Sequence, residues 1–150
     1  MPADHEHMMR IALEEAAQGG AEGNSAVGSI IVDGDQVVAR GRNLVTSNSD
    51  PTAHAETVAL RDAGAALKRT DFSGMTLYTT FEPCPMCCGA ILASGIATLV
   101  MGARHDPAQG SWGGYTVESL VEMTNRADQL TVVTGILTRE CADVRNVETR

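Results

Sequence analysis

The chain has 150 residues, of which 43% are hydrophobic and 20% charged, a composition ordinary for a globular protein. It has no apolar run near the roughly 20 residues of a membrane-spanning helix, and its first ten residues lack the basic and apolar stretches of a secretory signal. The formal net charge of −8, without a basic stripe, disfavours a nucleic acid backbone as partner. We therefore expect one cytoplasmic domain over residues 1–150, away from membranes, that binds a small molecule.

The first half of the chain predicts a helix, a hairpin and a second helix. Residues 4–18 carry apolar side chains at helical spacing, and three glycines are expected to end that helix. Two β-rich runs, 27–32 and 36–39, are separated by an Asp-Gly-Asp turn, which is a strong hairpin signal. A helix preceded by a proline is predicted over residues 53–68.

The second half alternates strands with helices and contains one long loop. In chain order, the expected elements are strand 75–80, helix 83–94, strand 97–102, glycine-rich loop 103–116, helix 117–124, strand 130–133 and helix 137–144. This alternation predicts an α/β fold in which helices cover both faces of a central mixed sheet.

Two short segments contain the residues that point to chemistry, His54-Ala55-Glu56 and Pro83-Cys84-Pro85-Met86-Cys87. Three of the four cysteines lie within five residues, which is typical of a metal or redox site rather than of a disulfide framework. A catalytic zinc takes three protein ligands and keeps one position open. His54, Cys84 and Cys87 supply an imidazole and two thiolates, so we expect one Zn²⁺ per chain at these residues.

Glu56 is the expected proton carrier. It lies two residues from His54, so both reach one site only if their helix points its first turn at the metal. A carboxylate in that position takes a proton from the attacking water, passes it to a ring nitrogen and protonates the departing amine. The expected enzyme is therefore a hydrolase of C–N bonds in cyclic amidines, which releases ammonia from an amino-substituted ring.

Three other interpretations fit parts of this pattern. A Cys-Pro-x-Cys segment at a helix start also describes a thioredoxin-like redox site. A structural zinc site would use Cys88 or Cys141 as a fourth ligand. A non-catalytic, zinc-stabilised binding subunit would keep the site without using it. All three leave Glu56 without a role.

The chain resembles the cytidine deaminase superfamily over residues 28–141, in the branch of cytosine, guanine and tRNA adenosine deaminases. The segments that carry the resemblance are residues 50–56 (DPTAHAE), 77–80 (LYTT), 82–87 (EPCPMC) and 89–91 (GAI). The resemblance implies a three-layer α/β/α sandwich with a five-stranded sheet, one zinc per chain and a homodimer. It also implies that Asn43 contacts the base.

We expect Asn43, Ala55 and Trp112 to bind the substrate. Trp112 lies among glycines in the loop 103–116, where its ring can stack on a flat heterocycle while the loop closes as a lid. His105 and Asp106, near the same loop, are expected to be ordinary loop residues.

The subgroups of this branch differ in substrate. The chain resembles guanine deaminases through residues 43–87, but its residues 107–117 lack the acid with which they read the purine. It resembles fungal-type cytosine deaminases at 76–80. It resembles tRNA adenosine deaminases at 102–104 and 135–141, without their basic loops. The acidic balance favours a free nucleobase or related amino-heterocycle, cytosine first and guanine or a triazine next. A tRNA-specific adenosine deaminase is the enzymatic alternative.

Overall fold

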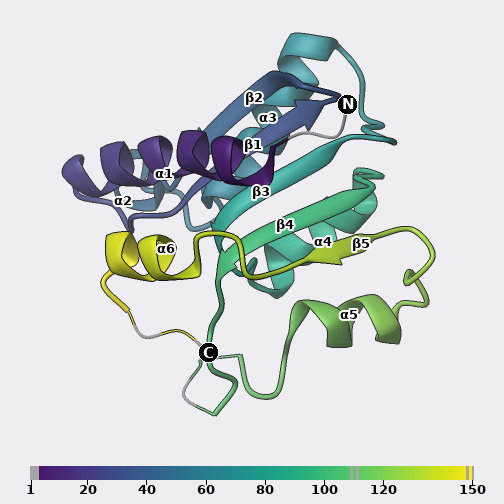
Figure 1. The fold of residues 1–150 in the computed structure, drawn as a ribbon. Helices are drawn as coiled ribbons and strands as arrows, with labels where there is room; N and C mark the ends of the chain where they lie inside the picture. Colours follow the sequence, from purple (N-terminus) through teal and green to yellow (C-terminus); the bar gives the residue numbers. More distant parts are fainter. Residues whose placement is uncertain (1–3, 109, 111, 148, 150) are drawn as a thin grey trace.

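A five-stranded mixed sheet with the strand order β2-β1-β3-β4-β5 forms the centre of the molecule (Figure 1). This computed structural model describes residues 4–108, 110, 112–147 and 149. The strands are β1 (Gly28–Asp33), β2 (Gln36–Arg42), β3 (Thr76–Phe81), β4 (Thr98–Ala103) and β5 (Thr131–Val133). Strand β1 pairs antiparallel with β2 and β3, whereas β3, β4 and β5 run parallel. The expected mixed sheet is therefore confirmed.

Helices cover both faces of this sheet, which confirms the three-layer architecture (Figure 1). The helices are α1 (His5–Ala21), α2 (Val45–Asn48), α3 (Ala55–Leu67), α4 (Pro85–Ala93), α5 (Val117–Met123) and α6 (Thr138–Arg145). Helices α1 and α6 pack on one face, and α3, α4 and α5 pack on the other. None of the helices among the described residues is long and apolar enough to cross a bilayer.

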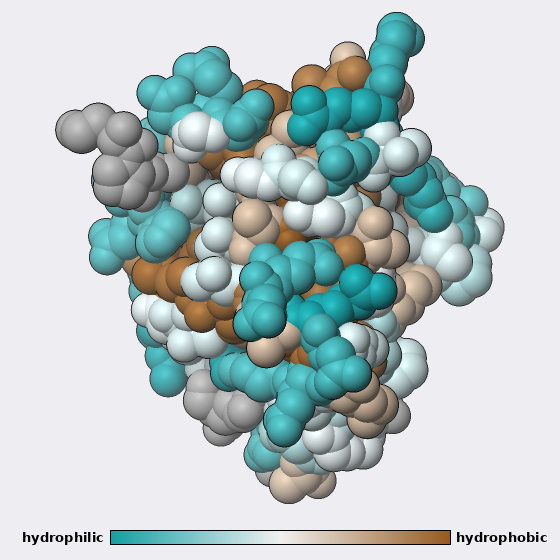
Figure 2. All heavy atoms as spheres, turned by 90° about the vertical axis from the view of Figure 1, so that its right-hand side faces the viewer, coloured by the Kyte–Doolittle hydropathy of each residue, from teal (hydrophilic) through white to brown (hydrophobic). Residues whose placement is uncertain are grey.

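The two cores follow from the alternation of side chains along each strand. Ile30 and Tyr78 lie opposite each other in the register and face α1 and α6. Their neighbours Ile31 and Leu77 face the core under α3 and α4. Because both faces are covered, these strands are continuous apolar runs rather than alternating ones. Hydrophilic residues occupy much of the outer surface in Figure 2, with apolar atoms visible between them.

One edge of the sheet brings together the segments that carry the candidate residues. Strand β2 ends beside the start of β1, and the start of β1 lies beside the end of β3. Strand β4 runs parallel to β3, so the carboxyl ends of β2, β3 and β4 meet at this edge. Helix α3, which comes after β2 and the short α2, and helix α4, which follows β3, both begin there. Ligands of open α/β sheets bind at such carboxyl ends.

Two local expectations differ from the structure. Helix α1 does not end at Gly19 and Gly20 but continues to Ala21. A Cβ atom at Gly19 would lie 3.4 Å from the Cβ of Arg42, so packing against β2 supports the helix through two weak helix formers. Helix α2 was not predicted. The N–H groups of Thr46 and Ser47 in its first turn donate to the side-chain oxygen of Asn24, a residue more than twenty positions away.

Candidate metal and catalytic site

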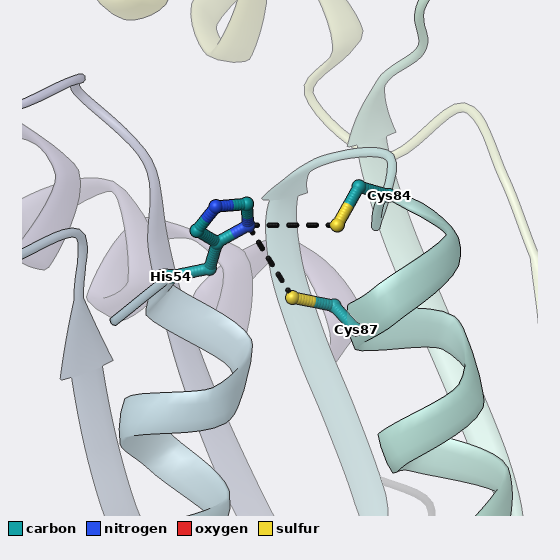
Figure 3. Close-up of side chains that lie close together, drawn as sticks. All are labelled: His54, Cys84 and Cys87. Carbon is teal, nitrogen blue, oxygen red and sulfur yellow. Dashed lines mark hydrogen bonds between the residues drawn. The ribbon is translucent and has the colours of Figure 1, made fainter. Parts of the chain in front are cut away.

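Three ligand atoms converge between the first turns of α3 and α4 (Figure 3). His54 is the N-cap residue of α3, and Cys84 is the N-cap residue of α4. Pro85 follows at the first helical position, where its fixed φ suits the turn and its missing N–H has no cost. Cys87 lies in the first turn of α4 and is completely buried.

The distances among these atoms fit a tetrahedral zinc ion. The Nδ1 atom of His54 lies 3.5 Å from the Sγ atoms of both Cys84 and Cys87. With Zn–N near 2.0–2.1 Å and Zn–S near 2.3 Å, a tetrahedral ion requires N–S separations of about 3.6 Å. The three atoms all lie within 4.8 Å of one another, and no fourth histidine, cysteine or carboxylate among the described residues belongs to this group. A tetrahedral zinc ion held by these three residues would therefore keep one coordination position for water or substrate.

The two thiols are electrostatically prepared for a cation. A hydrogen bond from the Cys87 thiol lowers the pKa of Cys84 to about 5. The same hydrogen bond, together with burial, raises the pKa of the Cys87 thiol. A zinc ion would hold both cysteines as thiolates, so its binding would release their remaining proton. The N-terminus of α4 also favours the negative charge.

Glu56 lies beside this site without joining the ligand group. It is the second residue of α3 and is only 3% exposed. Burial raises the pKa of its carboxyl to about 7. Its Oε1 atom is fully buried and accepts no hydrogen bond from the described residues. The first turn of α3 therefore points both His54 and Glu56 at one place, as a shared site requires.

A cavity of about 190 Å³ opens beside the metal ligands. The residues around it are Ser25, Val27, Asn43, His54, Ala55, Glu56, Phe81, Glu82, Cys84, His105, Trp112 and Arg145. The set includes the three residues expected to bind substrate, Asn43, Ala55 and Trp112. Its volume is below the roughly 300–1,000 Å³ of sites for drug-sized ligands, so it suits one flat heterocycle.

The side chain of Asn43 is oriented by its own turn. Its Oδ1 atom accepts the N–H of Val45 at 3.0 Å. The amide NH₂ group is then the part of Asn43 that can donate to a ligand in the cavity. Trp112 is half-exposed and lines the same cavity.

The sequence did not predict several residues of this cavity. His105 was expected to be an ordinary loop residue, but it lines the cavity and its ring stacks on Tyr115 with 5.6 Å between centroids. The Tyr115 hydroxyl donates to the backbone oxygen of Pro83 at 2.5 Å, which ties the loop to the start of the metal-binding segment. Arg145 reaches the cavity from α6 and carried no sequence signal. Glu82 could have been suspected, because it directly precedes the Pro-Cys segment.

A buried ion-pair network lies under the loop 103–116. The side chain of Glu82 is fully buried, and its Oε2 atom lies 2.9 Å from Nη2 of Arg104. Arg104 also pairs with Glu118 at the start of α5. The same Oε2 atom accepts the N–H of Val117 at 3.0 Å. Both ends of the loop are therefore attached to Glu82.

The remaining cysteines do not support a structural zinc site. Cys141 packs against Gly102 within the core under α1 and α6. Cys88 belongs to the core on the opposite face of the sheet. Both are buried free thiols outside the ligand group, so neither supplies the fourth ligand that a closed site needs.

Comparisons with known proteins agree with this geometry. Residues 2–103 match the family described as the cytidine and deoxycytidylate deaminase zinc-binding region. The chain is 41% identical over 145 residues to a tRNA-specific adenosine deaminase of Haemophilus influenzae, which covers 91% of this chain and 78% of that protein. The matched segments span from 8% to 81% of the lengths of the curated relatives.

Two solved structures have the same fold. One comes from work on A-to-I editing by tRNA:A34 deaminases, with a TM-score of 0.80 and 35% identity, and the match covers 92% of this chain and 98% of that chain. The other is a guanine deaminase of Nitrosomonas europaea, with a TM-score of 0.82 and 30% identity, covering 96% and 84%.

Proposed function

Since this chain belongs to the cytidine and deoxycytidylate deaminase family, whose members are zinc-dependent hydrolases of C–N bonds, we propose that it converts adenosine to inosine within a tRNA. The observation that carries the proposal is the 41% identity to a tRNA-specific adenosine deaminase over 91% of the chain. This reverses the order expected from charge alone, in which a free base, cytosine first, preceded the tRNA substrate.

The size of the cavity is compatible with a base presented by RNA. Enzymes that deaminate a base within a nucleic acid take that single base out of the stack and into a fitted pocket. A cavity of about 190 Å³ holds one base and leaves the rest of the polymer outside.

The proposed roles follow from the positions of the side chains. Zinc, when bound, supplies the lowered pKa that lets water act as a nucleophile near neutral pH. Glu56 accepts one proton of the attacking water at its buried carboxylate and delivers it to the ring nitrogen. It then accepts the remaining proton of the added hydroxyl group and delivers it to the departing amine, which leaves as ammonia. Asn43 donates its amide N–H to the base, and Trp112 stacks on its face. Ala55, in the first turn of α3, forms part of the cavity wall.

A free purine base is a second candidate substrate. It is favoured by the similarity to the guanine deaminase of Nitrosomonas europaea and by the acidic net charge. A free base carries no phosphate, so it needs no basic surface around the cavity.

One assay separates the two candidates. The zinc-loaded protein is incubated with an adenosine-containing anticodon stem-loop, guanine, cytosine, adenine or adenosine, and both ammonia and the deaminated product are quantified. Inosine formed in the stem-loop, and lost in Glu56→Gln, supports the tRNA substrate. Efficient turnover of guanine with no inosine in RNA refutes it in favour of the free base.

The homodimer implied by the family resemblance also stays a proposal. Light scattering of the purified chain gives the test, because a dimer doubles the mass of 15.8 kDa. A monomer that is fully active would exclude a dimer as the functional form.

A further inference from the structure

Arg145 is a cation at the catalytic cavity that comes from a distant element. It is the last residue of α6 and lines the same cavity as Glu56 and His54. Its guanidinium carbon lies 5.4 Å from the centre of the Phe81 ring, within the range of a cation–π contact. Phe81 ends β3, so the ring holds the guanidinium beside the edge of the sheet where the metal ligands gather.

Arg145 is partly buried without a carboxylate partner, whereas the other arginines that the structure describes are either exposed, as are Arg10, Arg69 and Arg126, or paired with an acid. Arg40, Arg42, Arg61, Arg104 and Arg139 each lie within 4.0 Å of a carboxylate. Over the part of the chain that the structure describes, Arg145 has no such ion pair. Its Nε atom is buried, and within the same residues it donates no hydrogen bond. A buried donor without an acceptor is unfavourable unless a ligand supplies one.

Arg145 could serve only the end of its helix, since a cation in the last turn interacts favourably with the helix dipole. That role needs neither a contact with Phe81 nor a place in the wall of the cavity. Arg139 on the same helix illustrates the contrast, because its side chain is 72% exposed and pairs with Asp143.

We propose that Arg145 binds a phosphate oxygen of the nucleotide that carries the target base. A planar guanidinium matches the geometry of phosphate and donates charge-assisted hydrogen bonds to it. A free base has no phosphate, so Arg145 makes the enzyme prefer a base carried by a nucleotide. This inference rests on the proposed function, and it adds a specificity residue to the same site.

The first experiment measures binding of an anticodon stem-loop over a series of salt concentrations. Arg145→Gln keeps much of the side-chain volume over Phe81. In this variant the dissociation constant rises about tenfold at low salt. The plot of the logarithm of the association constant against the logarithm of the salt concentration becomes shallower by about 1. The turnover number at saturating RNA stays within about twofold. Arg145→Lys keeps the slope, because the charge remains. Arg139→Gln, the matched control on α6, changes none of these values.

The second experiment separates the phosphate from the rest of the substrate. Binding of adenosine and of adenosine monophosphate is measured by calorimetry in a Glu56→Gln background, which prevents turnover. The monophosphate binds more tightly than the nucleoside, and Arg145→Gln abolishes the difference. Melting curves of each variant establish that it is folded.

The outcomes distinguish this inference from the proposed function. An unchanged salt slope in folded Arg145→Gln, or an equal loss for adenosine and its monophosphate, overturns the phosphate contact while inosine formation in RNA still supports the function. Absence of inosine in RNA refutes the function, and the calorimetric comparison then decides the phosphate contact by itself. A wild-type protein that binds nucleoside and nucleotide equally overturns it.

Discussion

A side chain at Gly41 would lie 2.3 Å from the backbone oxygen of Ala55, so β2 and the first turn of α3 meet backbone to backbone. The same Cβ atom would lie 2.5 Å from the backbone nitrogen of Ala59. Neither atom can rotate away as the end of a side chain would. This close approach sets the depth at which α3, and with it His54 and Glu56, lies on the sheet.

Gly41→Ala is therefore expected to lower the free energy of unfolding by about 3 kcal/mol, because the added methyl group overpacks a backbone contact. It should also weaken zinc binding, since α3 must move. Gly89→Ala is the control: a Cβ at that helical position meets no atom within 4 Å, so stability rises by about 1 kcal/mol or less. Urea unfolding of the two variants measures whether each substitution lowers or raises the free energy of unfolding. Equal stabilities would contradict the assigned role of Gly41.

Glu82→Gln should destabilise the protein by about 2 kcal/mol, because it leaves the charge of Arg104 with only the half-exposed Glu118 as partner. Since both ends of the loop 103–116 depend on Glu82, KM should rise as well. Glu118→Gln removes the exposed partner and should cost less than about 1 kcal/mol. Thermal unfolding measures the loss of stability in each variant, and steady-state kinetics measures the change in KM. A larger loss of stability in Glu118→Gln than in Glu82→Gln would refute the prediction.

Glu56→Gln should lower kcat by about 10²- to 10⁴-fold, since the amide cannot move protons. Zinc content should stay at one ion per chain, because Glu56 lies outside the group of three ligands. Zinc content and single-turnover kinetics, measured on the same preparation, distinguish loss of proton transfer from loss of metal. Loss of zinc from this variant would show that Glu56 supports the metal rather than the proton transfers.

Removing Cys87 should remove the metal. In Cys87→Ala the tetrahedral set loses a thiolate, so bound zinc should fall from one per chain toward zero, and the melting temperature should fall with it. Cys88→Ala, at the neighbouring position, should keep the ion, because Cys88 belongs to the core. Elemental analysis after dialysis against a mild chelator gives the readout. Retention of zinc by Cys87→Ala would overturn the ligand set.

Trp112→Ala should raise KM about tenfold or more, because stacking of a base on an aromatic ring contributes about 1–3 kcal/mol. Trp112→Phe should recover most of that loss. Since the chain has a single tryptophan, ligand binding in the wild type should also quench its fluorescence. A wild-type emission that does not respond to saturating substrate would place the ring outside the binding site.

The residues close together in sequence could be predicted, whereas those joined only by the fold could not. His54 and Glu56 lie within three residues, and Cys84 and Cys87 lie three residues apart, so spacing suggested that each pair acts together. The two pairs were joined in one site by the ligand chemistry of zinc and by the family resemblance. The sheet was also predictable, because runs such as Ile30-Ile31-Val32 are apolar on both faces. Element boundaries shifted by one to three residues, since tertiary contacts such as those of Gly19 override local propensity.

Arg145 and His105 show the limit of sequence reasoning. Arg145 reaches the cavity only because α6 packs beside β3 and β4. His105 lines it because stacking on Tyr115 and the proximity of Glu82 orient its ring. Helix α2 depends in the same way on Asn24, which accepts the N–H groups of Thr46 and Ser47 from another part of the chain. Such long-range contacts leave no periodicity or spacing to recognise.

His54 and Cys84 both stand at N-cap positions, yet neither side chain makes a capping hydrogen bond. Most helices satisfy their first N–H groups with a side chain at this position. Here the two side chains turn toward each other in the ligand group instead, so α3 and α4 begin without that local support. A newly made chain that has not acquired zinc should therefore open first at these two turns and be cut there by proteases. Metal acquisition would then decide how long a molecule survives as well as whether it can react.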